Sequence, residues 1–228
     1  MHYREIIEAA SPHVGSQNFR HWFHGSKVVD ASGKPLVVFH GTFEDFREFK
    51  LDSEKRRANG LNRLGFWFDV GTETPNWFAI GGPDSSGGKV LLAYLSIKRP
   101  FVFTSEPVFK DDEDTLARHA GDEQWGTFNK HVEMMDRQDS YDHMVRMIAA
   151  PSINGPGGPR KREEAVERFR DELIQEGYDG IYLPETYADA GTRGGKKSDW
   201  WIAFRSNQIK AVMGNSGGFD ADNPDITE

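Results

Sequence analysis

Cysteine is absent from this chain of 228 residues. The absence excludes disulfides, thiolate metal ligands and a cysteine nucleophile, and it fits a cytosolic setting. No apolar run approaches the ~20 residues that a transmembrane helix needs, and residues 1–6 lack the apolar segment of a secretory signal peptide. We therefore expect a cytoplasmic protein without a membrane partner.

Positive charge is scarcer than negative charge. The formal net charge is −8 at pH 7, with 28 Lys and Arg against 36 Asp and Glu. A field of that sign repels a phosphate backbone, which disfavours a broad nucleic-acid groove. Two basic stretches, 56–63 and 160–162, leave a smaller basic patch open.

Several common catalytic motifs are missing as well. The chain has no Gly-x-Ser-x-Gly, no P-loop and no dinucleotide-fold glycine pattern. Its eight histidines form no pair with carboxylates at metal-ligand spacing, so we expect no metal site. Aromatic residues, by contrast, make up 12% of the chain, including six Trp and sixteen Phe. Such side chains can build a core or line a pocket for a planar ligand.

The apolar pattern predicts strands toward both ends of the chain and helices between them. Strand character falls at 27–30, 36–39, 65–68, 90–97, 101–103, 180–183, 200–204 and 208–212, and helical character at 3–10, 76–80, 111–119, 124–136, 139–148 and 161–176. The helix over 161–176 ends before Gly177, a residue suited to a helix C-cap. We expect one α+β domain over 1–228, with a helical insert at about 104–176 and a polar tail over 214–228.

The tripeptide His40-Gly41-Thr42 follows the predicted strand over 36–39 and is the first candidate for chemistry. A histidine there can donate or accept a hydrogen bond at the floor of a pocket. Because Gly41 has no Cβ, a ligand can approach its backbone closely, and its N–H and C=O can pair with a carboxamide. The tripeptide alone equally fits a strand-end histidine that caps a loop.

Further segments accompany the tripeptide in a set order. An aromatic stretch over 19–23 precedes it, segments 65–68 and 76–79 follow, and segments 200–204 and 207–210 come near the C-terminus. In this order they resemble the ADP-ribosyltransferases of the His–Tyr–Glu clade. They resemble more closely the ADP-ribosyltransferase-like domains of phage and mobile-element polyvalent proteins, including the tail over 215–226. The resemblance covers about 19–103 and 177–226.

The resemblance implies a split, strongly bent β-core that clamps NAD as co-substrate. It implies that His40 contacts ribose hydroxyls, that the Gly41 backbone holds the nicotinamide carboxamide, and that Thr42 lies beside it. A catalytic and NAD-binding role for His40 follows from the same resemblance.

Three more residues are assigned to NAD through the second motif. Phe66 and Trp67 lie in its strand, and Phe78, eleven residues after Trp67, matches the family tyrosine that stacks on nicotinamide. Phenylalanine can stack in the same way but lacks the hydroxyl. By the same resemblance Phe78 is also a catalytic residue. Core packing is the alternative for Trp67 and Phe78.

Another candidate for NAD binding lies in the loop before Gly65. Asn62 is placed there to reach the NAD phosphates or to cover the site, together with Arg57 and Asn59. A solvated loop without a ligand is the alternative.

The third motif departs from the family pattern. Aligned on Phe204 and Gln208, the position of the family glutamate holds Trp200, and the nearest carboxylate is Asp199. Because side chains alternate faces along a strand, the Asp199 side chain would point away from the site unless a bulge or a strand start turns it back. We expect Asp199 to stabilise the oxocarbenium-like transition state; a solvated strand-end acid is the alternative. Spacing singles out none of three other acids: Asp69, Glu73 and Glu185.

The resemblance therefore predicts a mono-ADP-ribosyltransferase that cleaves NAD at the nicotinamide–ribose bond and modifies a macromolecule. Trp200 at the acid position argues against chain elongation, and the acidic net charge favours a protein acceptor over nucleic acid. Two alternatives stay open: a non-catalytic module that binds NAD, ADP-ribose or a partner, and an NAD glycohydrolase. The family also implies a phage, plasmid or toxin setting, with an effector delivered into a host cell.

Overall fold

The fold is described from a computed structural model of the chain. The structure describes residues 13–51, 60–80, 87–103, 159–187 and 197–228, together with 141, 144, 145 and 148. The helices predicted over 3–10, 111–119 and 124–136, and most of the one over 139–148, lie outside the described residues. So do Arg57 and Asn59.

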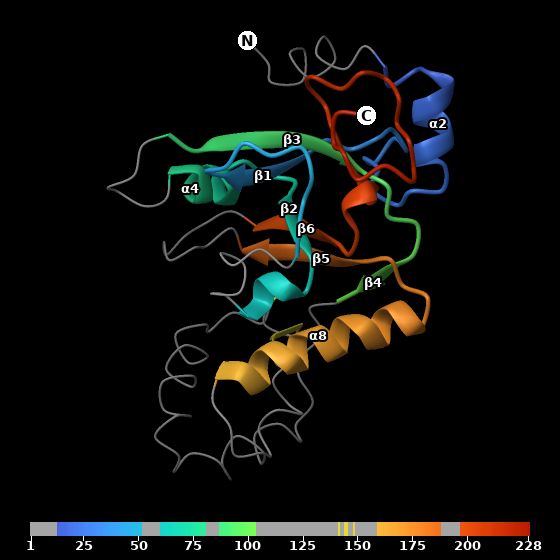
Figure 1. The fold of residues 1–228 in the computed structure, drawn as a ribbon. Coiled ribbons are helices and arrows are strands. Elements are labelled where there is room, and N and C mark those ends of the chain that lie inside the picture. The colour runs from blue at the N-terminus through green and yellow to red at the C-terminus, as the bar shows by residue number, and fades with distance from the viewer. Residues whose placement is uncertain are drawn as a thin grey trace, which may run out of the picture.

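The described strands form one sheet that interleaves the two ends of the chain (Figure 1). They are β1 (Val38–Thr42), β2 (Phe66–Asp69), β3 (Lys89–Leu95), β4 (Pro100–Val102), β5 (Gly180–Tyr187), β6 (Lys197–Ala203) and β7 (Ile209–Ala211). The sheet has seven strands in the order β4-β5-β6-β2-β1-β3-β7. Only β4 and β5 pair in parallel. The mixed α+β class predicted from the sequence is confirmed.

Three α-helices accompany the sheet in the described parts of the chain: α2 (Gln17–Phe23), α4 (Glu73–Ile80) and α8 (Pro159–Gln175). α8 confirms the predicted helix over 161–176. It ends at Gln175 and is followed by Gly177, which has a φ of +87°, with the Tyr178 N–H donating to the Leu173 carbonyl. None of the described helices is long and apolar enough to cross a membrane.

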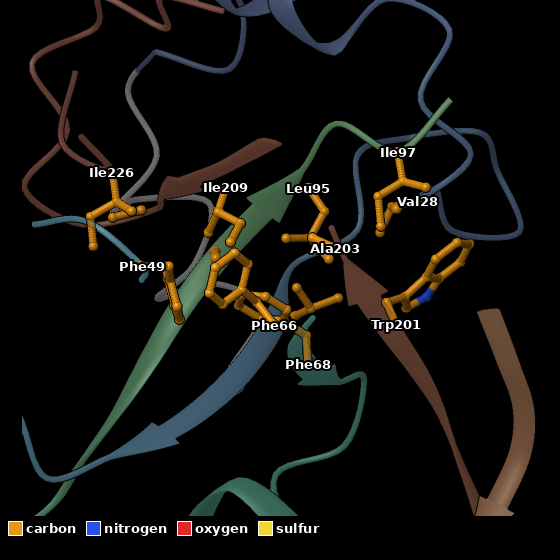
Figure 2. Close-up of a cluster of buried hydrophobic side chains, with 13 residues drawn as sticks. Val28, Phe49, Phe66, Phe68, Leu95, Ile97, Trp201, Ala203, Ile209 and Ile226 are labelled. Carbon is orange, nitrogen blue, oxygen red and sulfur yellow. The ribbon is translucent and has the colours of Figure 1, made fainter. Parts of the chain in front are cut away.

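The two faces of the sheet carry separate cores. On one face Phe66 and Phe68 from β2 pack with Trp201 and Ala203 from β6 (Figure 2). On the other face Ile202 belongs to the cluster beneath α8, which buries Val166, Leu173, Ile181 and Leu183. The alternation of residues 200–203 between the faces follows from the two-residue period of a strand.

Several strand boundaries differ from the prediction. β1 begins at Val38 and includes His40-Gly41-Thr42 rather than ending before it. The predicted strand over 27–30 is wrong: Val29 makes an isolated bridge to Pro35 around a tight turn. β5 and β6 extend beyond their apolar runs because they pair with each other out to Tyr187 and Lys197. Asp199 therefore lies inside β6, not at its start.

Candidate functional site

Among neighbouring strands of the described sheet, β1 and β2 have the shortest ladder. Its register contains a single pair, Phe39 with Asp69, whereas β1 pairs with β3 all along Val38 to Thr42. From His40 onward, β1 and β2 therefore separate, and backbone groups along this opening need other partners. The split that the resemblance implies takes the form of this opening in an otherwise continuous sheet.

His40 lies in the opening. Its Nδ1 is 2.7 Å from the carbonyl oxygen of Trp67. A carbonyl can only accept, so Nδ1 carries the proton, and Nε2 is the acceptor nitrogen whenever the ring is neutral. The ring packs against Phe49 and Phe68, with centroids 5.1 and 5.4 Å away. An imidazole held in one tautomer and one orientation suits a hydrogen bond from a hydroxyl such as that of a ribose.

Gly41 is in direct contact with α4. A Cβ at this position would overlap the Pro75 carbonyl oxygen and lie 2.9 Å from Phe78 Cβ. Glycine is therefore required here by the approach of the helix, not only by the approach of a ligand. The same contact brings Phe78 beside Gly41, as the resemblance implies.

Phe78 is a large apolar side chain that remains half exposed, at 50%. Its position beside Gly41 leaves an aromatic ring at the surface next to the opening, where it can stack on a planar ligand. Thr42 uses its hydroxyl locally, because Oγ1 accepts the Glu44 N–H at 3.1 Å. That bond stabilises the turn at the end of β1.

Asn62 lies in the 3-10 helix Gly60–Arg63. This segment is tied to α8 through an ion pair of 2.6 Å between Arg63 and Glu167, and through a hydrogen bond from Arg170 to the Arg63 carbonyl. The segment before β2 is therefore anchored to the helix that covers the sheet, and Asn62 is half-buried within it.

Phe66 and Trp67 point to opposite faces of β2. Phe66 is 1% exposed and packs against Phe49. Our assignment of Phe66 to NAD is thus corrected: strand alternation turns its ring into the core. Trp67 is half-buried and meets Trp200 and Tyr141 edge-on, with ring centroids 6.1 Å away in each case.

Asp199 does not lie beside His40. β2 lies between the strands that carry them, so two strand spacings, about 10 Å, separate β1 from β6. Asp199 instead accepts the Tyr182 hydroxyl at 2.8 Å and the Glu185 N–H at 3.0 Å. Both carboxylate oxygens thereby hold β5, and these contacts explain Asp199 as a clamp rather than as the acid that we expected.

The clamp sits where β5 is irregular. Its register against β6 shifts between Leu183 and Thr186, and Glu185 adopts a φ of +52°, in the left-handed region. Burial, followed by the hydrogen bond to Asp199, raises the pKa of Tyr182. The Tyr182 hydroxyl therefore remains a proton donor to Asp199 at neutral pH.

Trp200, at the position of the family acid, shares a face with Trp67. Its cross-strand partner on β2 is Asp69. The carboxylate next to this aromatic pair is therefore Asp69, which the sequence offered only as one acid among several. The register of β2 against β6 identifies it, and register follows from tertiary pairing rather than from spacing along the chain.

Asp69 is 3% exposed. Its Oδ1 accepts the Gly71 N–H at 2.6 Å and the Ser198 hydroxyl. Burial raises the pKa of Asp69, against the hydrogen bonds from Ser198 and Gly71 and the nearby Thr74 and Trp200, which lower it. Thr74 and Trp200 lie close to the carboxylate without a hydrogen bond to it, since Oδ2 of Asp69 has no hydrogen-bond partner among the described residues.

Three other polar atoms, on α4, β2 and β6, share this property. Thr74 Oγ1 and the Nε1 atoms of Trp67 and Trp200 are likewise buried without a well-formed hydrogen bond to any described residue. Buried polar groups in native proteins nearly always have partners, so such atoms need water or a ligand. The described residues contain no group of three or more metal-ligating side chains.

The oriented histidine at an opening in the sheet of this mixed α+β fold, with Gly41 and the exposed ring of Phe78 beside it, is the arrangement that the resemblance to ADP-ribosyltransferases implies. The model of one family, ADP-ribosyltransferase in polyvalent proteins, matches residues 30–219. The chain therefore belongs to this family, whose activity is of the ADP-ribosyltransferase type. Comparison with curated proteins and with solved structures finds no match.

Proposed function

We propose that the protein is a mono-ADP-ribosyltransferase that uses NAD and binds its nicotinamide at the opening between β1 and β2. One observation carries the proposal: the His40 imidazole is hydrogen-bonded to the Trp67 carbonyl at this opening, next to Gly41 and the exposed ring of Phe78. Phe78 stacks on the nicotinamide, and Nε2 of His40 accepts a ribose hydroxyl.

The reaction needs little covalent help from the protein. The bond between the nicotinamide nitrogen and the ribose carbon breaks, and its electron pair leaves with nicotinamide. The acceptor then bonds to the same carbon and loses a proton. Because the leaving group is already cationic, positioning and electrostatic stabilisation of the ribose cation supply most of the rate acceleration.

The acceptor is a protein side chain in this proposal. The net charge of −8 repels nucleic acid, and a protein acceptor requires no basic groove. A second function is favoured by a specific observation. Trp200 stands at the family's acid position and Asp199 is engaged with β5, which fits a module that binds NAD without cleaving it.

Incubation with cell lysate and NAD labelled on its adenosine half distinguishes these functions. We expect release of free nicotinamide together with protease-sensitive label on macromolecules. Label sensitive to nuclease would indicate a nucleic-acid acceptor, and release without macromolecular label would indicate a glycohydrolase. Calorimetric binding of NAD without any nicotinamide release would show a binding module and reject the transferase.

A matched pair of histidine variants ties the activity to the opening. Loss of one net hydrogen bond and its orientation lowers affinity by about tenfold, so His40→Ala is expected to weaken NAD binding by that factor. His21→Ala, on the exposed side of α2, is expected to bind like wild type. Equal affinities for the two variants would place NAD elsewhere.

A further inference from the structure

We propose that Asp69 supplies the carboxylate of this site, in place of the glutamate that the family carries at the position of Trp200. The inference rests on the proposed function. Asp69 and Trp200 are direct cross-strand partners in the β2–β6 ladder. Such partners point to the same face with their Cβ atoms about 5 Å apart. Relative to Trp200, Asp69 therefore lies one strand away on the same face of the sheet. Asp199 lies one residue away on the same strand, and its side chain points to the opposite face.

The same register places Asp69 at the opening. Asp69 also pairs with Phe39 on β1, the residue before His40. This is the last register pair before β1 and β2 separate. A carboxylate at this point lies on the face of the sheet that carries Trp67, Trp200 and, on β1, Gly41. The His40 ring packs on the opposite face, against Phe49 and Phe68, so a ligand in the opening between β1 and β2 would meet His40 from one side and Asp69 from the other.

Helix α4 joins the carboxylate to the nicotinamide subsite. Thr74 lies four residues before Phe78, so the two side chains lie on one side of the helix. Phe78 contacts Gly41, and Thr74 lies close enough to Asp69 to influence its pKa. The helix face that carries the stacking ring therefore also faces the carboxylate.

The bonding of Asp69 suits an acid that acts on charge. The Gly71 N–H and the Ser198 hydroxyl hold Oδ1 and fix the orientation of the group. Oδ2 is buried and has no well-formed hydrogen bond among the described residues. Because Asp69 is screened from solvent, its charge acts on a nearby cation more strongly than an exposed carboxylate would.

The charge enters the reaction in one step. As the C–N bond breaks, the electron pair goes to the nicotinamide nitrogen, which becomes neutral, and the positive charge moves to the ribose. The Asp69 carboxylate stabilises that ribose cation until the acceptor bonds to it and gives its proton to water. The step is a substitution at the ribose carbon and needs no oxidant or reductant.

The test compares two isosteric variants, Asp69→Asn and Asp199→Asn. We expect Asp69→Asn to slow nicotinamide release at least about 100-fold, the scale for removal of one preorganised electrostatic group. Asp199→Asn, scaled to its folded fraction, is expected to stay within a few-fold of wild type. Asp69→Ser removes the same charge with a smaller side chain and serves if the Asn variant does not fold.

A binding measurement separates charge from structure. NAD carries a cationic nicotinamide ring and NADH a neutral one, so a nearby carboxylate favours NAD. We expect the ratio of the NADH to the NAD dissociation constants to fall about tenfold in Asp69→Asn, the scale for loss of a close opposite charge, and to stay unchanged in Asp199→Asn. A purely structural Asp69 would weaken both ligands equally.

The outcomes are distinguishable. If wild type neither binds NAD nor releases nicotinamide, the proposed function fails and the role of Asp69 fails with it. If wild type releases nicotinamide while Asp69→Asn matches its rate and its NADH-to-NAD ratio, only the assignment of Asp69 is overturned. A folded Asp199→Asn that loses turnover while Asp69→Asn keeps it would return the role to Asp199.

Discussion

Gly41 lies where both helix α4 and the proposed ligand approach the backbone of β1 closely. A Cβ would overlap the Pro75 carbonyl oxygen, so Gly41→Ala must push α4, and with it Phe78, away from β1. Overpacking of this kind costs about 1–3 kcal/mol. We expect that loss in urea unfolding, together with NAD binding weakened by more than about tenfold, because stacking depends on ångström-scale placement.

A glycine elsewhere in the chain provides the control. Gly15 has nothing within 4 Å of its Cβ position, so Gly15→Ala is expected to change neither stability nor binding. A Gly41→Ala variant that loses stability but binds NAD like wild type would show that α4 takes no part in the site.

The buried carboxyl of Asp69 makes stability depend on pH in an uncommon direction. Its pKa is raised, with burial as the largest cause. Stability from the protonated group is therefore complete below the unfolded-state pKa of about 3.9 and is lost as the pH rises through the folded-state pKa. We expect Asp69→Asn to be more stable than wild type at neutral pH, by a margin that vanishes near pH 3, as measured by urea unfolding.

Asp225 makes stability depend on pH in the opposite direction. Burial raises its pKa, but the N–H and hydroxyl of Thr227 and the charge of Arg47 together lower it below the ordinary value. Its contribution is present above the unfolded-state pKa and is lost as the pH falls through the folded-state pKa. Asp225→Asn is thus expected to be less stable than wild type at neutral pH. A common sign for the two variants would contradict the assignment.

Motif order indicates His40, Gly41 and Phe78 as site candidates from the sequence, and the fold brings Phe78 beside Gly41. The acid is harder to assign from the sequence. Distance along the chain favours Asp199, but strand alternation and register favour Asp69. Register results from pairing between segments about 130 residues apart, and neither local spacing nor composition encodes that pairing.

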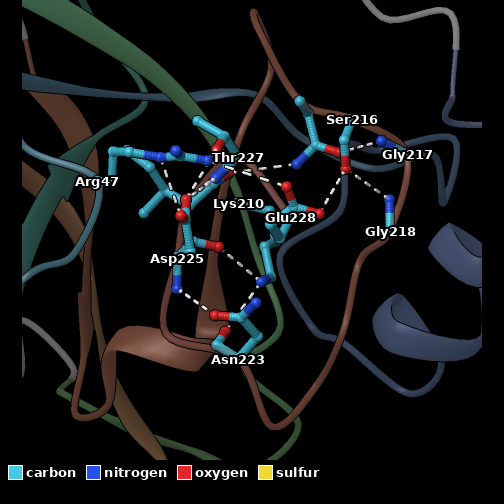
Figure 3. A network of polar contacts seen from close by, with 11 residues as sticks. Arg47, Lys210, Ser216, Gly217, Gly218, Asn223, Asp225, Thr227 and Glu228 are labelled. Atoms are coloured by element: carbon cyan, nitrogen blue, oxygen red, sulfur yellow. Dashed lines mark hydrogen bonds and ion pairs between the residues drawn. The ribbon is translucent and has the colours of Figure 1, made fainter.

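Among the elements, the C-terminal tail shows how a polar segment becomes ordered. Lys210 on β7 is fully buried, and its Nζ donates to the carbonyls of Asn223 and Asp225 at 2.9 and 2.8 Å (Figure 3). The tail also adds backbone bonds, with the Ala211 N–H donating to the Ile226 carbonyl at 2.7 Å. The polar composition of 214–228 predicts only a tail, and these contacts show that it is an ordered edge.

Lys210→Met tests how much the tail depends on this ammonium group. Burial lowers the pKa of Lys210, against the charges of Asp220, Asp225 and Glu228. Methionine fills the space but leaves two carbonyls without donors, at a cost of about 1–3 kcal/mol for a buried unsatisfied group. We expect that loss of stability in urea unfolding, whereas Lys34→Met, at an exposed position, is expected to be neutral. Equal stabilities would show that water replaces the ammonium group.

On the scale of the whole molecule, the topology brings distant segments of the chain together around the opening between β1 and β2. The sheet places β6 beside β2 and β7 beside β3, so strands from the last third of the chain close around strands from the first half. Family resemblance predicted this mixed fold with a split. The single β1–β2 register pair and the bulge in β5 were not predictable, because both depend on how segments distant in the sequence meet.

Hydrogen exchange with and without NAD tests the whole arrangement. Amides beside the opening have few ladder partners, so they are expected to exchange faster than those of the β1–β3 ladder in the free protein. NAD bound at the opening would slow exchange in β1, β2 and α4, and would leave α2 and the tail over 214–228 unchanged. Equal protection of the tail would indicate global stabilisation by the ligand, and protection confined to the tail would place NAD away from His40. In His40→Ala, the same NAD concentration is expected to give markedly less protection of β1 and α4, which would trace the effect to the imidazole at the opening.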